Sequence, residues 1–146
     1  MLRQKRKGIM LSLLLGTTSF SVQVNEDVLH AISYVESGQD SKAIGDNGQA
    51  VGSFQIHRIY VREANRILKA YVFDYSLRSD PEASEEMARV VLTYWGNYFE
   101  KKGYRIGPAE LCSIHRHPNS RWSPKYMESD LEKGRTKKLK AYLNKG

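Results

Sequence analysis

Apolar side chains recur at spacings of three and four residues after position 25, which is the pattern of one buried face of an α-helix. This stripe consists of Val28, Leu29, Ile32 and Val35. Asn25 is suited to cap the start of the helix and Gly38 to end it. Glu36 continues the line set by Val28 and Ile32 at four residues a step. The sequence therefore predicts a carboxylate at the end of the buried stripe.

The helical period is lost between 40 and 53, and residues 43–51 are typical of two short extended arms around Asn47-Gly48. Asn-Gly is a strong hairpin signal because both central residues of a type I′ turn need a positive φ. The sequence therefore predicts a small β-hairpin directly after the first helix.

Helical periodicity returns further along the chain, with a second helix predicted over 57–70. Its core side is expected to consist of Ile59, Tyr60, Ala64, Ile67 and Leu68. Later helix starts are marked by Asp80-Pro81, Pro108 and Ser123-Pro124. The third helix is expected to stop before Gly103. Since 146 residues suffice for one ordinary domain, the predicted fold is α+β, mainly α, with one β-hairpin after the first helix.

The first residues are basic and are followed by a short apolar run. Four charges lie between Arg3 and Lys7, residues 9–15 are mostly apolar, and small residues follow up to Ser21. This order predicts a secretory signal peptide over 1–21, cleaved near Ser21, because the run is too short to span a bilayer. An uncleaved anchor or a core helix is the alternative. A cleaved leader implies a secreted or periplasmic protein of the cell envelope.

The net charge of +7 and the sequence pI near 9.5 favour a nucleic-acid partner until the charges are located. Residues 133–146 hold six basic side chains and no acid, whereas 22–132 hold 13 basic and 16 acidic residues, a net −3. We therefore expect no nucleic-acid binding, a domain over 22–132 and a basic C-terminal tail over 133–146.

The basic tail has a partial apolar side made of Leu131, Leu139 and Leu143. We expect part of it to dock on the domain. The rest is either a solvated helix end or an attachment to an anionic cell-wall or membrane surface.

Two carboxylates lie ten residues apart in unlike settings. Glu36 ends an apolar stripe, where a carboxyl holds its proton more easily than in water and can donate it, while Asp46 lies beside the polar hairpin turn. An acid that protonates a leaving oxygen and an anion that stabilises a sugar centre are the minimum for glycoside cleavage. The pattern leaves two alternatives open: a solvated surface Glu36, and an Asp46 that bonds its own backbone.

Three motifs carry a resemblance to a known family. They are Val35-Glu36-Ser37-Gly38, Gly45-Asp46-Asn47-Gly48 and Gly52-Ser53-Phe54-Gln55-Ile56. This order of Glu-Ser, glycine-rich hairpin and Gly-x-x-Gln resembles the catalytic core of the lysozyme superfamily, which includes soluble lytic transglycosylases and invertebrate-type, destabilase-like lysozymes. The invertebrate-type family is the more similar, and Leu111–His115 followed by Tyr126 resembles its later segment. The resemblance covers roughly residues 28–132 and implies a lysozyme-like fold.

The resemblance also implies roles for single residues. Glu36 would be the general acid, and Asp46 the nucleophile or electrostatic partner. The implied substrate-binding residues are Ser37, Ser53, Gln55, His115, Asn119 and Tyr126. The family's activity implies a monomeric muramidase that cuts the β-1,4 bond between N-acetylmuramic acid and N-acetylglucosamine in peptidoglycan strands, without a cofactor. The alternatives are a lytic transglycosylase that forms 1,6-anhydro muropeptides, and a catalytically impaired wall-binding protein.

The chain departs from the family pattern at Arg116-His117-Pro118-Asn119, where the family has Asn-Gly-Gly-Pro. Bulky groups there replace glycines that let a backbone approach the substrate, so the departure concerns the shape of the sugar subsites. The family's disulfides are absent as well, because Cys112 is the only cysteine.

Cys112, His115 and His117 are three metal-capable side chains within six residues. Structural zinc needs a fourth ligand, and no second Cys/His cluster exists, so we expect a buried cysteine and no metal. A thiol nucleophile paired with His115 is also disfavoured, since nothing in the sequence indicates a lowered pKa for Cys112.

Overall fold

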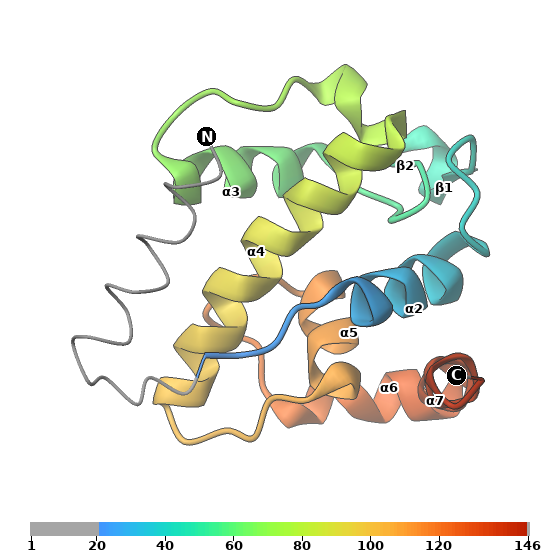
Figure 1. The fold of residues 1–146 in the computed structure, drawn as a ribbon, viewed down its shortest axis with the longest axis vertical. Coiled ribbons are helices and arrows are strands. Elements are labelled where there is room, and N and C mark those ends of the chain that lie inside the picture. Colours follow the sequence, from blue (N-terminus) through green and yellow to red (C-terminus); the bar gives the residue numbers. More distant parts are fainter. Residues whose placement is uncertain (1–20, 146) are drawn as a thin grey trace, which may run out of the picture.

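The computed structural model describes residues 21–145, which form a mainly helical domain with one two-stranded antiparallel sheet (Figure 1). The predicted signal peptide lies outside the described residues except for Ser21. Val22, just after the expected cleavage site, is buried, and its backbone N–H donates to Oδ1 of Asn97 at 2.8 Å. Among the described helices, none is long and apolar enough to cross a membrane.

The first described helix, α2 (Glu26–Ser37), confirms the predicted helix and both of its ends. The side chain of Asn25 accepts the backbone N–H of Val28, and Gly38 ends the helix in the left-handed region at φ +68°. All four residues of the predicted apolar stripe are buried in the core. The local sequence therefore sets the position of Glu36, one residue before the end of this helix.

The hairpin follows directly, with β1 (Ile44–Gly45) paired antiparallel to β2 (Ala50–Val51). The predicted two-residue type I′ turn is wrong: the strands are joined by four residues, 46–49, that include the short 3₁₀ turn η1 (Asp46–Gly48). Pairing stops because Asp46 already leaves the extended conformation at φ +48°, followed by Asn47 at +56° and Gly48 at +90°.

The remaining elements are α3 (Arg58–Leu68), η2 (Tyr75–Ser79), α4 (Pro81–Lys101), α5 (Pro108–Arg116), η3 (Pro124–Tyr126), α6 (Met127–Glu132) and α7 (Arg135–Leu143). The predicted helix starts at Pro81 and Pro108 and the end before Gly103 are confirmed. The long helix α4 crosses the molecule and packs against α3 and α5 (Figure 1). Its inner side contributes the largest share of the core, including Met87, Val91, Leu92 and Phe99.

The core side predicted for the second helix is correct only in part. Tyr60 and Ala64 are buried, but Ile59 is 66% exposed and Leu68 is exposed as well. The buried face of α3 packs on α4 and includes Val61 in place of Ile59. Ile59 lies outside this face of the helix. Ile59 lines a pocket, as described below.

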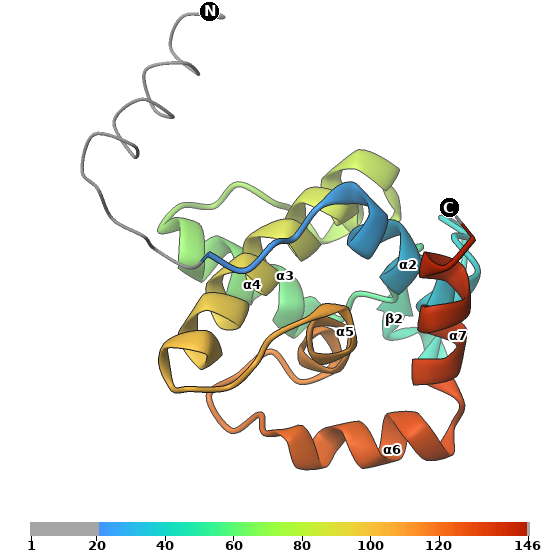
Figure 2. The ribbon, with the colours of Figure 1, turned by 60° about the horizontal axis from the view of Figure 1, so that its bottom comes forward.

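The segment expected as a basic tail contains α7, which packs on α2 and α5 (Figure 2). Leu139 is fully buried and Leu143 partly, which confirms the expected docking, whereas Leu131 is exposed. The rings of Tyr142 and Tyr34 lie 5.1 Å apart between α7 and α2. Most of the predicted tail is therefore a structural part of the domain, and α7 brings its first residue, Arg135, close to the end of α2.

Candidate active site

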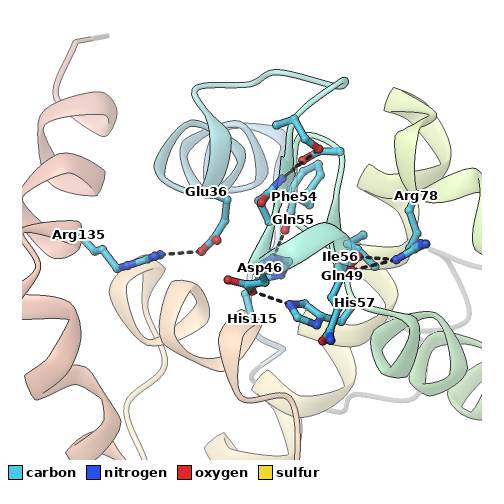
Figure 3. A network of polar contacts seen from close by, with 12 residues as sticks. Glu36, Asp46, Gln49, Phe54, Gln55, Ile56, His57, Arg78, His115 and Arg135 are labelled. Carbon is cyan, nitrogen blue, oxygen red and sulfur yellow. Dashed lines mark hydrogen bonds and ion pairs between the residues drawn. The ribbon is translucent and has the colours of Figure 1, made fainter.

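A pocket of about 370 Å³ lies where the end of α2, the hairpin, α5 and the start of α7 meet (Figure 3). Six acidic, histidine and arginine side chains line it: Glu36, Asp46, His57, His115, Arg116 and Arg135. Tyr60 and Gln55 also line it, and Ile59 gives it an apolar edge. The pocket thus collects side chains from five separate parts of the sequence.

Glu36 lies on the wall formed by the end of α2, and its side chain is only 9% exposed. Its Oε1 accepts a hydrogen bond from Nη1 of Arg135 at 3.0 Å (Figure 3). Glu36 ends the apolar stripe as expected, but its surroundings also contain a guanidinium that α7 brings to the carboxylate, which the sequence did not indicate.

Asp46 lies on the hairpin side of the pocket, and its side chain is 69% exposed. Its Oδ2 lies 2.8 Å from Nε2 of His57, the residue that precedes α3 (Figure 3). The carboxylate is thus turned toward His57, while the backbone carbonyl of Asp46 accepts the N–H of Gln49 in the turn. The two carboxylates have the unlike settings that the sequence predicts, one nearly buried and one solvated.

His115 forms the floor of the pocket and is fully engaged. Its Nε2 lies 2.8 Å from the carbonyl oxygen of Phe54, and its Nδ1 lies 2.9 Å from the hydroxyl of Tyr60. Since a carbonyl only accepts, Nε2 carries the proton and Nδ1 accepts from Tyr60. Burial lowers the pKa of His115, against a smaller opposing effect of Glu36, and burial also raises the pKa of Tyr60 well above 10.0.

Gln55 and Ser37 hold the two carboxylate-bearing segments together. Nε2 of Gln55 donates to the carbonyl oxygens of Gly52 at 2.9 Å and Ala43 at 3.3 Å, which braces the hairpin. Oγ of Ser37 donates to the carbonyl of Ser53 at 2.7 Å and so ties the end of α2 to the following loop. Gln55 lines the pocket, whereas Ser37 and Ser53 do not; Ser53 is buried beside a second pocket.

Asn119 and Tyr126, expected to bind substrate, are not among the residues that line the pocket. Oδ1 of Asn119 accepts the backbone N–H of Arg121 at 2.9 Å and so shapes a turn. The ring of Tyr126 stacks on His117 with centroids 4.4 Å apart. The end of α5 and the segment after it therefore contribute Arg116 and Pro118 to the pocket instead.

Sequence reasoning missed Arg135, His57 and Tyr60 as pocket residues. Arg135 was assigned to the basic tail, and it lies 99 residues from its partner Glu36. His57 follows the Gly-x-x-Gln motif by two residues, but no spacing rule connects it with Asp46. Tyr60 was expected as a core residue only, and its hydroxyl is what completes the contacts of His115.

Cys112 is buried, and burial raises the pKa of its thiol to about 12. A thiol that stays protonated at neutral pH is not a nucleophile. Both ring nitrogens of His115 are already engaged with Tyr60 and Phe54. Across residues 21–145, no group of three His, Cys, Asp or Glu side chains is arranged to hold a metal ion.

The chain has no match among protein-family models, curated proteins or solved structures. The lysozyme-like reading therefore rests on the motifs and on the geometry of this pocket.

Proposed function

We propose that the protein is a lysozyme-like glycosidase that cleaves the β-1,4 bond between N-acetylmuramic acid and N-acetylglucosamine in peptidoglycan, in the cell envelope or outside the cell. The observation that carries the proposal is the pairing, in one pocket, of a nearly buried carboxylate from the end of a helix with a solvated one from the adjoining hairpin. These are the two environments that separate a proton donor from an anion in glycoside cleavage.

Glu36, once protonated, donates its proton to the glycosidic oxygen as the bond from that oxygen to C1 breaks. Asp46 stabilises or captures the positive C1 centre. Water then adds to C1, and the Glu36 carboxylate takes up the proton that the water releases. His115 and Tyr60 do not exchange protons in this scheme; they are bonded to each other and line the same pocket as Glu36.

A lytic transglycosylase is the second candidate, and one observation favours it. Asp46 is engaged with His57 at 2.8 Å, which reduces its availability as a nucleophile. In this version Glu36 acts alone: it protonates the leaving oxygen, and the 6-hydroxyl of the muramoyl sugar attacks C1 and returns its proton to Glu36. The products differ by one water, so mass analysis of the released muropeptides separates the two reactions.

Glu36→Gln tests the proposal, because glutamine keeps the size of the side chain and cannot donate a carboxyl proton. We expect wild-type protein to clear purified cell walls and the variant to lose at least about 100-fold in rate while still binding them. Glu128→Gln, an exposed carboxylate on α6, is the matched control and should clear like wild type. Binding without any clearing by wild type would instead support the impaired wall-binding protein and contradict the enzyme.

Asp46→Asn in the same assay tests the second carboxylate. Loss of clearing supports a role for Asp46 at C1, whereas retained clearing with anhydro products supports the transglycosylase.

A further inference from the structure

The pocket has a cationic side that the proposed mechanism does not use. Arg116 and Arg135 both line it, from the end of α5 and the start of α7. In the described part of the chain, Nη1 of Arg116 is buried and has no hydrogen-bond partner. Arg135 has a single carboxylate opposite it, Glu36, although the proposed reaction requires that carboxylate to take up a proton. Two arginines thus line one pocket that offers fewer hydrogen-bond acceptors than their N–H groups can use.

A guanidinium with too few acceptors is destabilising, so an acceptor on a ligand in the pocket that Arg116 lines would stabilise it. Guanidinium groups fit planar carboxylates well, because their N–H donors form a fixed fork. The second cation, Arg135, lies within 3.0 Å of Glu36. A carboxylate that reached Arg135 would therefore lie beside the carboxyl that protonates the leaving oxygen.

On the basis of the proposed function, we infer that Arg116 and Arg135 bind the free carboxylate of the 3-O-lactyl group of muramic acid, so that the preferred substrate is a glycan strand without stem peptides. The lactyl group is attached to the sugar ring itself and is the acid closest to the bond being cut. Carboxylates of a stem peptide lie further out along the peptide, away from Glu36.

If the lactyl carboxylate is recognised, removal of the stem peptide precedes efficient cleavage of the glycan strand. In a strand with stem peptides the lactyl carboxyl is an amide and carries no charge. Hydrolysis of that amide adds water across the C–N bond, releases the peptide amine and leaves the lactyl carboxylate. An amide hydrolase that acts first would therefore supply the preferred substrate, while intact walls would be cleared more slowly.

The same contact changes the surroundings of Glu36. When Arg135 turns to the lactyl carboxylate, Glu36 loses its ion-pair partner in a site where its side chain is only 9% exposed. A neutral strand leaves Glu36 paired with Arg135.

The test compares two substrates that differ in one group. Strands freed of stem peptide by an amidase are used as they are, or after their lactyl carboxylates have been coupled to methylamine to give neutral amides. Wild-type protein is expected to cleave the free-carboxylate strands about 10- to 100-fold faster, the range for losing a hydrogen-bonded charge. This comparison needs no variant, so it does not depend on a variant folding.

Arg116→Gln and Arg135→Gln should each reduce that ratio toward one, while Arg121→Gln, an exposed arginine that does not line the pocket, should keep it. Equal rates on the two strands, an unchanged ratio in both pocket variants, or a preference for intact walls would each overturn the inference while leaving the glycosidase in place.

A binding measurement with Glu36→Gln separates the inference from the proposed function. Calorimetry should show tighter binding of free-carboxylate strands than of the neutral amides even if wild type proves to cleave neither. Cleavage with no such difference in binding would contradict the inference alone.

Discussion

His115 lines the pocket, but its hydrogen bonds lie inside the protein. Both of its nitrogens are engaged inside the protein, with Tyr60 and Phe54, and it is fully buried. The resemblance implied a substrate contact, whereas the hydrogen bonds describe a neutral histidine that joins α3, α5 and the loop after the hairpin. Its contribution is to hold these three segments around the pocket.

This role predicts an acid-sensitive fold. Burial holds the pKa of His115 below 6.5 in the folded state, so the unfolded chain binds the proton first as the pH falls. The free energy of unfolding should therefore be unaffected by His115 above pH 6.5 and should decrease as the pH falls from 6.5 toward the lowered pKa. The decrease is at most about 1.4 kcal/mol per pH unit.

Urea unfolding at about pH 7.5 and about pH 5.5 measures this effect. His115→Gln should be less stable than wild type at both values but should lose less on going to acid. The pKa of the half-buried His117 is also lowered, mainly by burial, so His117→Gln is the control and should show a smaller change. A wild-type-like acid loss in His115→Gln would contradict the assignment.

At the scale of elements, the hairpin is held in place by Arg78, which follows it in the sequence by almost thirty residues. Nη1 of Arg78 donates to the carbonyl oxygens of Gln49 at 3.0 Å and Ile56 at 3.3 Å (Figure 3). The backbone of Arg78 also packs directly on Gly52, where a Cβ would collide with the Arg78 carbonyl oxygen. The segment between α3 and α4 therefore holds the hairpin that carries Asp46 through Gln49, Gly52 and Ile56.

Two glycine substitutions separate backbone strain from this close packing. Gly48→Ala puts a Cβ into open space at φ +90° and should cost about 1–2 kcal/mol of stability from the left-handed backbone alone. Gly52→Ala adds the collision with Arg78 at φ +83° and should cost about 1–3 kcal/mol more. Denaturant unfolding of both variants measures the difference, and equal losses would mean that the contact with Arg78 yields easily.

At the scale of the whole molecule, α7 in the basic C-terminal segment has two unlike faces. Leu139 and Arg135 face the domain, whereas Lys137 and Lys140 are exposed. Removing the segment from Lys133 onward would delete the buried leucine and the partner of Glu36 together. Attachment to an anionic surface is therefore better tested by changing exposed lysines only.

Lys137→Gln combined with Lys140→Gln, in a Glu36→Gln background that leaves the wall intact, should weaken retention on isolated cell walls at low salt. The difference should disappear as salt screens the charges. Lys42→Gln combined with Lys101→Gln removes the same charge from exposed positions elsewhere and should have less effect. Equal retention of the two double variants would reject a dedicated anionic contact on α7.

The sequence by itself determined the features that depend on neighbouring residues. Asn25 and Gly38 mark the two ends of α2, and the apolar stripe sets which side of the helix is buried. Asn47-Gly48 marks the hairpin. The location of Glu36 and Asp46 on these elements therefore follows from local preferences. The exact turn escaped prediction because three successive residues adopt positive φ, although local rules require only two.

Only the tertiary structure decided what surrounds these carboxylates. The contact between Glu36 and Arg135 joins residues 99 apart, and that between Tyr60 and His115 joins residues 55 apart. Such contacts arise from the packing of α7 on α2 and of α5 against its neighbours, and the pattern of one segment carries no information on which distant side chain will face it. The sequence therefore supplied the two acids, and the packing of distant helices supplied the cations, the floor and the pocket around them.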